Sequence, residues 1–345
     1  MLPGACQESR RKQRICVVTD GGHQMGMGHV LQSTTLAKAL APAAELSFLT
    51  KSDAQIVAAI REAGFAVTVH RDDTEIFAHL RQYAPDVVLF DKIDVDVQLA
   101  RRIRTELTAR LVIFTNLTGA NDYAHMVVLQ RAADLRTDAV NRLRNESYTD
   151  PRTGTRYFYG PRYWVLRPEF HAYRKRGKRR PAQTNRILLA FGGSDPTNLS
   201  SMVLDKLLRD PSAYAIDLIL GPQFNQCAAV ESVLDMHRDR RGAVSVYRNA
   251  SNVAELMYAA DLAITAAGMS MFETLCVGTP VIVIPQDQLQ RDTYQGLMRL
   301  LEVDELDVLG SVIKNSDFTC PEDPVIAAME IGDGIQDLIE SVLTG

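Results

Sequence analysis

A glycine-rich stretch near the N-terminus, DGGHQMGMGHV at 20–30, has the residue types of a ligand site. Gly26 and Gly28 carry no side chain, so the backbone can approach a ligand, and the helix beginning near His29 offers unpaired N–H groups to an anion. We expect the partial positive charge of that helix end to lower the pKa of His29, which favours a neutral base. Asp20 could orient this imidazole or a substrate hydroxyl. The alternative is that both residues only shape the turn.

A second glycine-rich turn, FGGSDPTNLS at 191–200, follows a predicted strand in the second half of the chain. Gly192 and Gly193 free its backbone, and the Ser194 hydroxyl can hydrogen-bond a ligand. Asn198 is placed to cap the next helix. Because one such turn follows the first strand of each half, the pattern favours two domains that face each other.

The third stretch is TAAGMSMFETLCVGTP at 265–280, where a turn of small residues leads into a predicted helix. The backbone amides of Gly268, Met269 and Ser270 would face a phosphate. Glu273 lies one turn inside the helix, where a carboxylate can accept hydrogen bonds from both hydroxyls of a ribose. A glutamate that merely faces solvent is the alternative.

Short β-branched runs alternate with amphipathic stretches along the chain, which predicts a mostly parallel sheet in each half. In the first half we expect strands at 14–19, 45–50, 66–70, 86–90 and 111–115, and helices at 30–41, 53–63, 75–83 and 95–108. In the second half we expect strands at 186–191, 215–221, 243–247, 261–265 and 280–285, and helices at 198–209, 225–238, 252–259, 269–277 and 288–301. Ligands bind at the carboxyl ends of such strands. Asp287 and Gln288 follow the last strand at that same end.

The length of 345 residues exceeds what one ordinary core needs and predicts two domains. The linker between them is inferred from six basic residues between Arg174 and Arg180, followed by Pro181. The tail beyond 305 could pack back on the first domain. The expected divisions are a disordered lead-in at 1–13, an N-terminal domain at 14–170, a linker at 171–185 and a C-terminal domain at 186–345.

The composition excludes several classes of protein. Hydrophobic residues make up 46% and charged residues 23%, as in soluble globular proteins, and the formal charge of −4 argues against a nucleic-acid binder. No apolar run is long enough for a membrane span, and none of signal-peptide length follows the basic N-terminus. The five cysteines have no metal-type spacing. We expect reduced thiols in a cytoplasmic protein without a metal site.

These stretches also resemble a known family. The glycine-histidine turn, YGPRYWVLRPEF at 159–170, FGGSDPTNL and the segment 252–280 resemble the pseudaminic-acid-pathway UDP-sugar hydrolases and the related SpsG-type spore-coat polysaccharide proteins. The region around Glu273 is similar to the nucleotide-binding stretch of the MurG-type, GT-B glycosyltransferases. The resemblance implies an α/β GT-B fold, in which two Rossmann-like, doubly wound domains face each other across a cleft.

With the residue chemistry above, the resemblance implies a UDP-sugar as partner, a possible sugar acceptor, and no metal or other cofactor. The catalytic candidates are His29 and Asp20. UDP contacts are expected from Gly192, Gly193, Ser194, Gly268, Met269, Ser270 and Glu273, and contacts to the sugar or phosphate from Gly26, Gly28, Asp287 and Gln288.

The leading hypothesis is hydrolysis of a UDP-linked amino or deoxy sugar, in surface-glycan or nonulosonic-acid-type biosynthesis, by attack of water on the anomeric carbon. A GT-B glycosyltransferase and a non-catalytic nucleotide-sugar binder are the alternatives. The chain departs from the family pattern at Gln32, where arginine is usual. It also departs at 91–93, where the family has Asp-x-Tyr, and at 115–117, where it has paired aspartates and an arginine. These positions concern the sugar and acceptor rather than the nucleotide.

Overall fold

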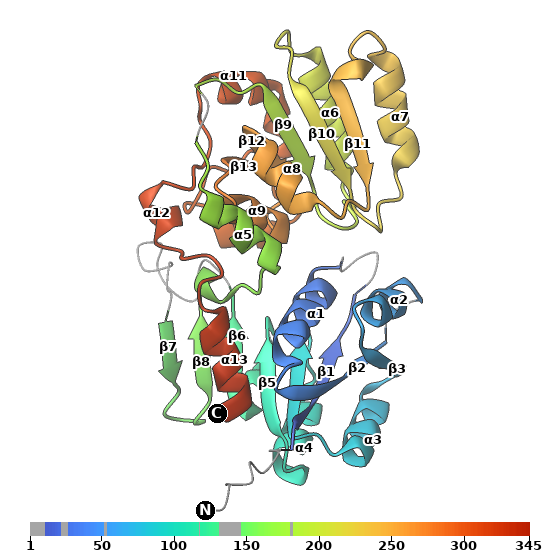
Figure 1. Ribbon diagram of the computed structural model, residues 1–345, viewed down its shortest axis with the longest axis vertical. Coiled ribbons are helices and arrows are strands. Elements are labelled where there is room, and N and C mark those ends of the chain that lie inside the picture. The colour runs from blue at the N-terminus through green and yellow to red at the C-terminus, as the bar shows by residue number, and fades with distance from the viewer. Residues whose placement is uncertain (1–10, 22–26, 52–53, 117, 131–145, 180–181) are drawn as a thin grey trace, which may run out of the picture.

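The computed structural model describes residues 11–21, 27–51, 54–116, 118–130, 146–179 and 182–345. Two mostly parallel sheets form two domains stacked along the long axis of the molecule (Figure 1). Both sheets are covered on their two faces. In β1 (Gln13–Thr19), for example, Ile15 and Val17 are buried in one cluster and Cys16 and Val18 in another, because successive side chains of a strand point to opposite faces.

The N-terminal sheet has the strand order β3-β2-β1-β4-β5-β6-β8-β7, in which the edge strand β7 alone runs antiparallel to its neighbour. Its other strands are β2 (Ala44–Thr50), β3 (Ala66–Val69), β4 (Val87–Asp91), β5 (Arg110–Phe114), β6 (Met126–Leu129), β7 (Glu146–Thr149) and β8 (Arg156–Tyr159). Its helices are α1 (Gly28–Leu40), α2 (Ala54–Glu62), α3 (Asp73–Tyr83) and α4 (Val97–Glu106). The strand order reverses direction between β1 and β4, where ligands of doubly wound sheets bind.

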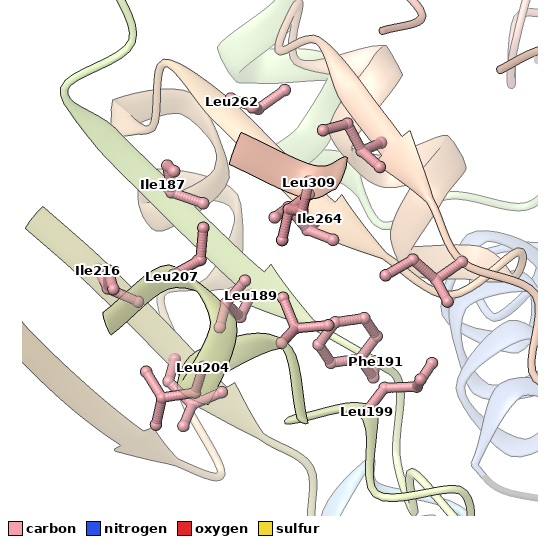
Figure 2. Packing of buried hydrophobic residues seen from close by; sticks show 14 of the residues in the cluster. Ile187, Leu189, Phe191, Leu199, Leu204, Leu207, Ile216, Leu262, Ile264 and Leu309 are labelled. Atoms are coloured by element: carbon pink, nitrogen blue, oxygen red, sulfur yellow. The ribbon is translucent and has the colours of Figure 1, made fainter. Parts of the chain in front are cut away.

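The C-terminal sheet has the order β11-β10-β9-β12-β13 and is parallel throughout. Its strands are β9 (Arg186–Ala190), β10 (Ala215–Leu220), β11 (Val244–Arg248), β12 (Leu262–Thr265) and β13 (Val281–Val283). Its helices are α6 (Leu199–Arg209), α7 (Cys227–Met236), α8 (Val253–Ala259), α9 (Met269–Cys276), α10 (Gln288–Tyr294), α11 (Leu309–Lys314) and α12 (Pro324–Ala327). Figure 2 shows one of its cores, where Leu189 of β9 and Ile264 of β12 lie with Leu204 and Leu207 of α6.

Two segments join the domains. Helix α5 (Pro168–Arg176) leads from the first sheet to the second, and α13 (Ile335–Thr344) returns to the N-terminal domain, where it lies against α1 and the turn Pro161–Tyr163 after β8 (Figure 1). Leu338 and Val342 of α13 are fully buried in the N-terminal core. The crossing is tied by ion pairs of Arg162 with Glu330 and Asp337, and of Arg174 with Asp333 at 2.8 Å.

The structure differs from the sequence expectation in three places. The expected linker at 171–185 is shorter, because helix α5, which begins at Pro168, continues to Arg176. Helix α10 ends at Tyr294 instead of reaching 301, and Gly296 follows with a left-handed φ of 79°. Strands β6, β7 and β8 were not expected. The lead-in at 1–13 lies largely outside the described residues, although β1 already begins at Gln13.

Candidate functional site

A cleft of about 610 Å³ lies between the domains, a size within the range of small-molecule sites. Met27, Gly28 and Leu31 of the α1 region line it from the N-terminal domain. The sequence-predicted residues that line it are Gly28, Gly192, Gly193, Ser194, Gly268, Met269, Ser270, Glu273 and Asp287. Asp20, His29 and Gln288 are not among the lining residues, and Gly26 lies outside the described residues.

The turn after β9 brings the two domains close together. Gly192 has a φ of 88°, which favours glycine, and a side chain at Gly193 would meet the backbone of Met27 at 3.4 Å. Asp195 holds this turn, because its carboxylate accepts hydrogen bonds from the amides of Leu199 (2.9 Å) and Ser200 (2.8 Å) at the start of α6. The turn is therefore fixed from the helix side while its glycines face the cleft.

Asn198 was expected to cap α6, and this expectation is wrong. Asn198 has a left-handed φ of 57° and caps no amide of the helix, because its side chain bonds Ser201. Asp195, three residues earlier, does the capping and also accepts a hydrogen bond from Gln286 Nε2 at 3.2 Å. Gln286 lines the cleft and links the turn after β9 to the segment after β13.

The turn after β12 leads into α9 through Gly268, and no side chain caps this helix. The first amides of a helix have no partner within it, so those at Met269 and Ser270 are suited to bind an anion at the cleft. The glycine-rich turn after β9 faces the same cleft. The two turns therefore present backbone amides to the same cleft, an arrangement that can bind an anion.

Glu273 lies on α9 and is almost completely buried, with 6% exposure. Its carboxylate accepts a hydrogen bond from Arg167 Nη2 at 3.3 Å, and Arg167 also pairs with Glu169 at 3.1 Å. Burial raises the pKa of Glu273 to about 7, while the charge of Arg167 opposes that rise. Among the described lining residues Arg167 is the only cation. Our site prediction missed it, although it belongs to the Leu-Arg-Pro stretch noted in the sequence.

A buried carboxylate on β4 organises the N-terminal side of the site. His29 Nδ1 lies 2.8 Å from Asp91 Oδ1, and Asp91 is 1% exposed. Gln32 Nε2 and Ser33 Oγ donate to the other carboxylate oxygen at 3.0 and 2.9 Å, and Thr115 Oγ1 donates to Oδ1 at 3.0 Å. These hydrogen bonds hold the carboxylate of Asp91 in place, and Asp91 in turn fixes the ring of His29 through Nδ1.

The direction expected for the pKa of His29 is wrong. Burial is the largest single influence and lowers this pKa, but the charge and hydrogen bond of Asp91, with the charges of Asp20 and Asp94, outweigh burial. The pKa is therefore raised above its usual value. A carboxylate 62 residues away in sequence, which the local pattern did not reveal as a partner, decides the direction.

Asp20 does not orient His29, as we expected it might, because Asp91 holds the imidazole. The carboxylate of Asp20 accepts a hydrogen bond from the Lys51 amide at 2.9 Å and lies 3.3 Å from Lys92 Nζ. Lys92 is itself buried and pairs with Asp94 at 3.2 Å. Asp20 therefore ties together the carboxyl ends of β1, β2 and β4.

Asp287 and Gln288, the two polar residues predicted after β13, differ in their position relative to the cleft. Asp287 lines the cleft and caps α10 by accepting a hydrogen bond from the Gln290 amide at 2.8 Å. Gln288 instead donates to Asp292 at 2.6 Å on the exposed side of α10 and does not reach the cleft. Gln286 and Gln290, which do line the cleft, are the amide side chains that the structure brings to this position.

The described residues contain no group of three or more histidine, cysteine, aspartate or glutamate side chains arranged to hold a metal ion. Within the same ranges, no helix has the length and apolar character that a membrane crossing requires.

Comparison with known proteins gives a family match for the C-terminal domain. Residues 187–296 match the glycosyltransferase family 28 C-terminal domain. An uncharacterized protein of Methanocaldococcus jannaschii is 35% identical over 95% of the chain, which spans 66% of the length of that relative. The spore coat polysaccharide biosynthesis protein SpsG of Bacillus subtilis is 28% identical over 81% of the chain and 79% of its own length.

Solved structures establish the fold. MurG of Acinetobacter baumannii is similar with a TM-score of 0.60 and 14% identity, over 96% of this chain and 99% of its own. HepE of Anabaena, solved in complex with UDP and glucose, has a TM-score of 0.54 and 13% identity, over 96% and 95% of the two chains. The chain therefore has the GT-B fold, with two Rossmann-like domains facing a cleft.

Proposed function

We propose that this chain is a UDP-sugar-using enzyme of glycan biosynthesis that releases UDP when a hydroxyl attacks the anomeric carbon of the sugar. Hydrolysis, with water as the attacking group, is our first proposal. The observation that carries the proposal is the Asp91–His29 pair at 2.8 Å, because His29 directly follows Gly28, which lines the cleft, and an imidazole held in this way can act as a base.

The C-terminal side of the cleft supports a nucleotide ligand. The turns at Gly192 and Gly268 offer backbone amides to a diphosphate, and Glu273 offers a carboxylate to the ribose hydroxyls. The match of this domain to a glycosyltransferase C-terminal domain supports a sugar nucleotide, and the UDP complex of HepE supports uridine as its nucleoside.

In the proposed reaction His29 acts as general base. Asp91 accepts a hydrogen bond from Nδ1, so Nε2 is the ring nitrogen that takes the proton of the attacking water. The water oxygen forms a bond to the anomeric carbon while the bond from that carbon to the diphosphate oxygen breaks. UDP leaves with the electron pair, and the amides at Gly193 and Ser270 stabilise its charge. Nε2 then returns its proton to solvent.

Transfer to an acceptor is the second proposal, and the family 28 match of residues 187–296 favours it. An acceptor hydroxyl would then take the place of water, with the same base and the same leaving group. A non-catalytic binder is the third, since Ile93 and Thr115 stand where the family pattern has tyrosine and aspartate.

The test is NMR of purified protein with a panel of UDP-amino-sugars, with and without candidate acceptors. Free sugar formed without acceptor would support hydrolysis, and the anomer formed first would give the stereochemistry. UDP release only with an acceptor would support transfer. Ligand binding without turnover in either condition, across the panel, would contradict both enzymatic proposals.

A further inference from the structure

Thr115, directly after β5, has an unusual backbone conformation. Its φ is 57°, in the left-handed region, where the branched β-carbon of threonine is crowded against the backbone. Glycine, asparagine and aspartate occupy this region at lower cost. Strained residues of this kind cluster at functional sites, where the surrounding structure holds them in place.

The neighbouring contacts hold this conformation. The Thr115 amide donates to Val128 O on β6 at 2.9 Å. The next residue, Asn116, is buried, accepts a hydrogen bond from the Val95 amide at 3.0 Å and donates to Asn121 at 2.9 Å. The backbone on both sides of Thr115 is therefore fixed by contacts that do not involve its hydroxyl.

The hydroxyl of Thr115 contacts both residues of the Asp91–His29 pair, which we call the dyad. Thr115 Oγ1 donates to Asp91 Oδ1 at 3.0 Å and lies 3.4 Å from His29 Nδ1. Gln32 and Ser33 bond the other oxygen of Asp91. Thr115 is therefore the donor that shares with His29 a single carboxylate oxygen.

We propose that Thr115 is a positioning residue whose hydroxyl, held by a left-handed backbone, competes with His29 for Asp91 Oδ1. This competition weakens the hydrogen bond between the carboxylate and the imidazole. This inference deepens the proposed function, because it concerns the base of that reaction. Its first consequence, however, concerns His29 alone and needs no substrate.

The charges that face His29 give the direction of the effect. Asp91 on β4, Asp20 directly after β1 and Asp94 after β4 all raise the pKa of His29, and Lys92 pairs with the last two. The Thr115 hydroxyl draws electron density from the oxygen that faces His29. Without this hydroxyl the imidazolium would be held more strongly, the pKa of His29 would rise further, and less neutral base would be present at neutral pH.

Three substitutions separate the hydroxyl from the backbone strain. Thr115→Val removes the hydroxyl and keeps the branched β-carbon, Thr115→Gly removes the hydroxyl and relieves the strain, and Thr115→Ser keeps the hydroxyl. Ala84→Gly is the matched control, because Ala84 ends α3 with a φ of 48° and does not contact the dyad.

The measurement is the titration of the His29 ring by NMR in the substrate-free chain, with His29→Ala used to assign its signal. We expect a higher pKa of His29 in Thr115→Val and Thr115→Gly, and the wild-type titration in Thr115→Ser and Ala84→Gly. Thr115→Gly and Ala84→Gly should both keep or raise the temperature of unfolding, since both relieve strain. A wild-type titration of His29 in folded Thr115→Gly would overturn the proposal.

A kinetic arm follows where turnover is found. Thr115→Val should lower kcat roughly tenfold with little change in KM and should shift the acidic limb of the pH–rate profile to higher pH. A chain without turnover on any substrate would refute the proposed function and leave the His29 titration to decide the role of Thr115.

Discussion

His29 and Asp91 lie next to a cleft that both domains form, and this location distinguishes them from an ordinary surface ion pair. The chain contains a useful comparison. His237 Nε2 lies 2.8 Å from Asp205 Oδ1 on the C-terminal domain, at the same distance as the pair at the site. His29 directly follows Gly28, which lines the cleft, whereas neither His237, Asp205 nor any residue next to them in the sequence lines it.

Replacement of His29 should therefore abolish catalysis and leave the affinity for the nucleotide unchanged. We expect His29→Ala to lower kcat about 10²–10⁴-fold, the usual contribution of a general base, with nearly unchanged affinity for UDP. His237→Ala is the matched control and should keep wild-type turnover. Undiminished turnover of His29→Ala in a steady-state assay would remove His29 from the mechanism.

If Glu273 binds the ribose as we propose, nucleotide binding should depend on pH. Its pKa is raised to about 7 by burial, and only the ionised carboxylate can accept hydrogen bonds from both ribose hydroxyls. Binding therefore releases a proton, and affinity for a UDP-sugar should increase from about pH 6 to about pH 8. Calorimetry with a UDP-sugar, whose diphosphate charge is constant over this range, measures the effect. Glu273→Gln should bind more weakly and with the pH dependence removed; an unchanged pH dependence in this variant would contradict the assignment.

The same group changes the stability of the ligand-free chain in the opposite direction. A carboxyl whose pKa is higher in the folded state stabilises that state below about pH 4.5, and this contribution is lost as the pH rises through about 7. Denaturant unfolding of wild type and Glu273→Gln at several pH values should therefore converge at low pH. At neutral pH the glutamine variant should be the more stable of the two. A constant difference across this range would show that Glu273 has the same pKa in both states.

The elements that carry the site were largely predictable, because their patterns are local. Strands such as β1 and β9 are β-branched runs of five to seven residues, followed directly by the glycine-rich turns. Strands β6, β7 and β8 have four residues each, which is shorter than the runs that we interpreted as strands, and their pairing in the sheet defines them: β6 lies between β5 and β8, and β7 pairs with β8.

Partners across the fold were not predictable from such patterns. The pairs His29–Asp91 and Arg167–Glu273 join residues 62 and 106 positions apart, and the turn types alone gave each residue without its partner. Asp195 and Asn198 are both good cap residues, and the backbone of the turn decides which one caps α6. Sequence patterns thus located the turns, but the packing of whole elements determined which side chains interact there.

Asp195 caps α6 and supports the turn at Gly192 and Gly193, where we propose that the diphosphate binds. We expect Asp195→Ala to lower the free energy of unfolding by about 1–2 kcal/mol and to weaken UDP binding, because the turn at Gly192 and Gly193 loses its support. Asp72→Ala is the control, since Asp72 caps α3 in the other domain through the Glu75 amide at 3.0 Å. It should cost similar stability with unchanged UDP affinity. Equal UDP affinity of wild type and Asp195→Ala would show that the cap does not support the nucleotide site.

The two domains depend on each other for stability as well as for the cleft, because the chain crosses between them twice. The N-terminal core includes Leu338 and Val342 of α13, so this domain is completed by a helix that follows the whole C-terminal sheet in the sequence. The cleft likewise takes residues from both domains. A substitution in the core-facing side of α13 should therefore destabilise the N-terminal half of the site and leave the C-terminal half unchanged.

Leu338→Ala tests this dependence. Leu338 is fully buried, and its truncation should lower the free energy of unfolding by about 2–5 kcal/mol through the lost transfer energy and the cavity left behind. Hydrogen exchange should show the loss of protection in β1 and α1, while β9 and β12 keep theirs and UDP still stabilises them. Glu340→Ala, on the exposed face of the same helix, should change stability by no more than about 0.5 kcal/mol. Wild-type protection of β1 in Leu338→Ala would mean that the N-terminal domain holds its fold without α13, and the returning helix would then be an attachment rather than part of that core.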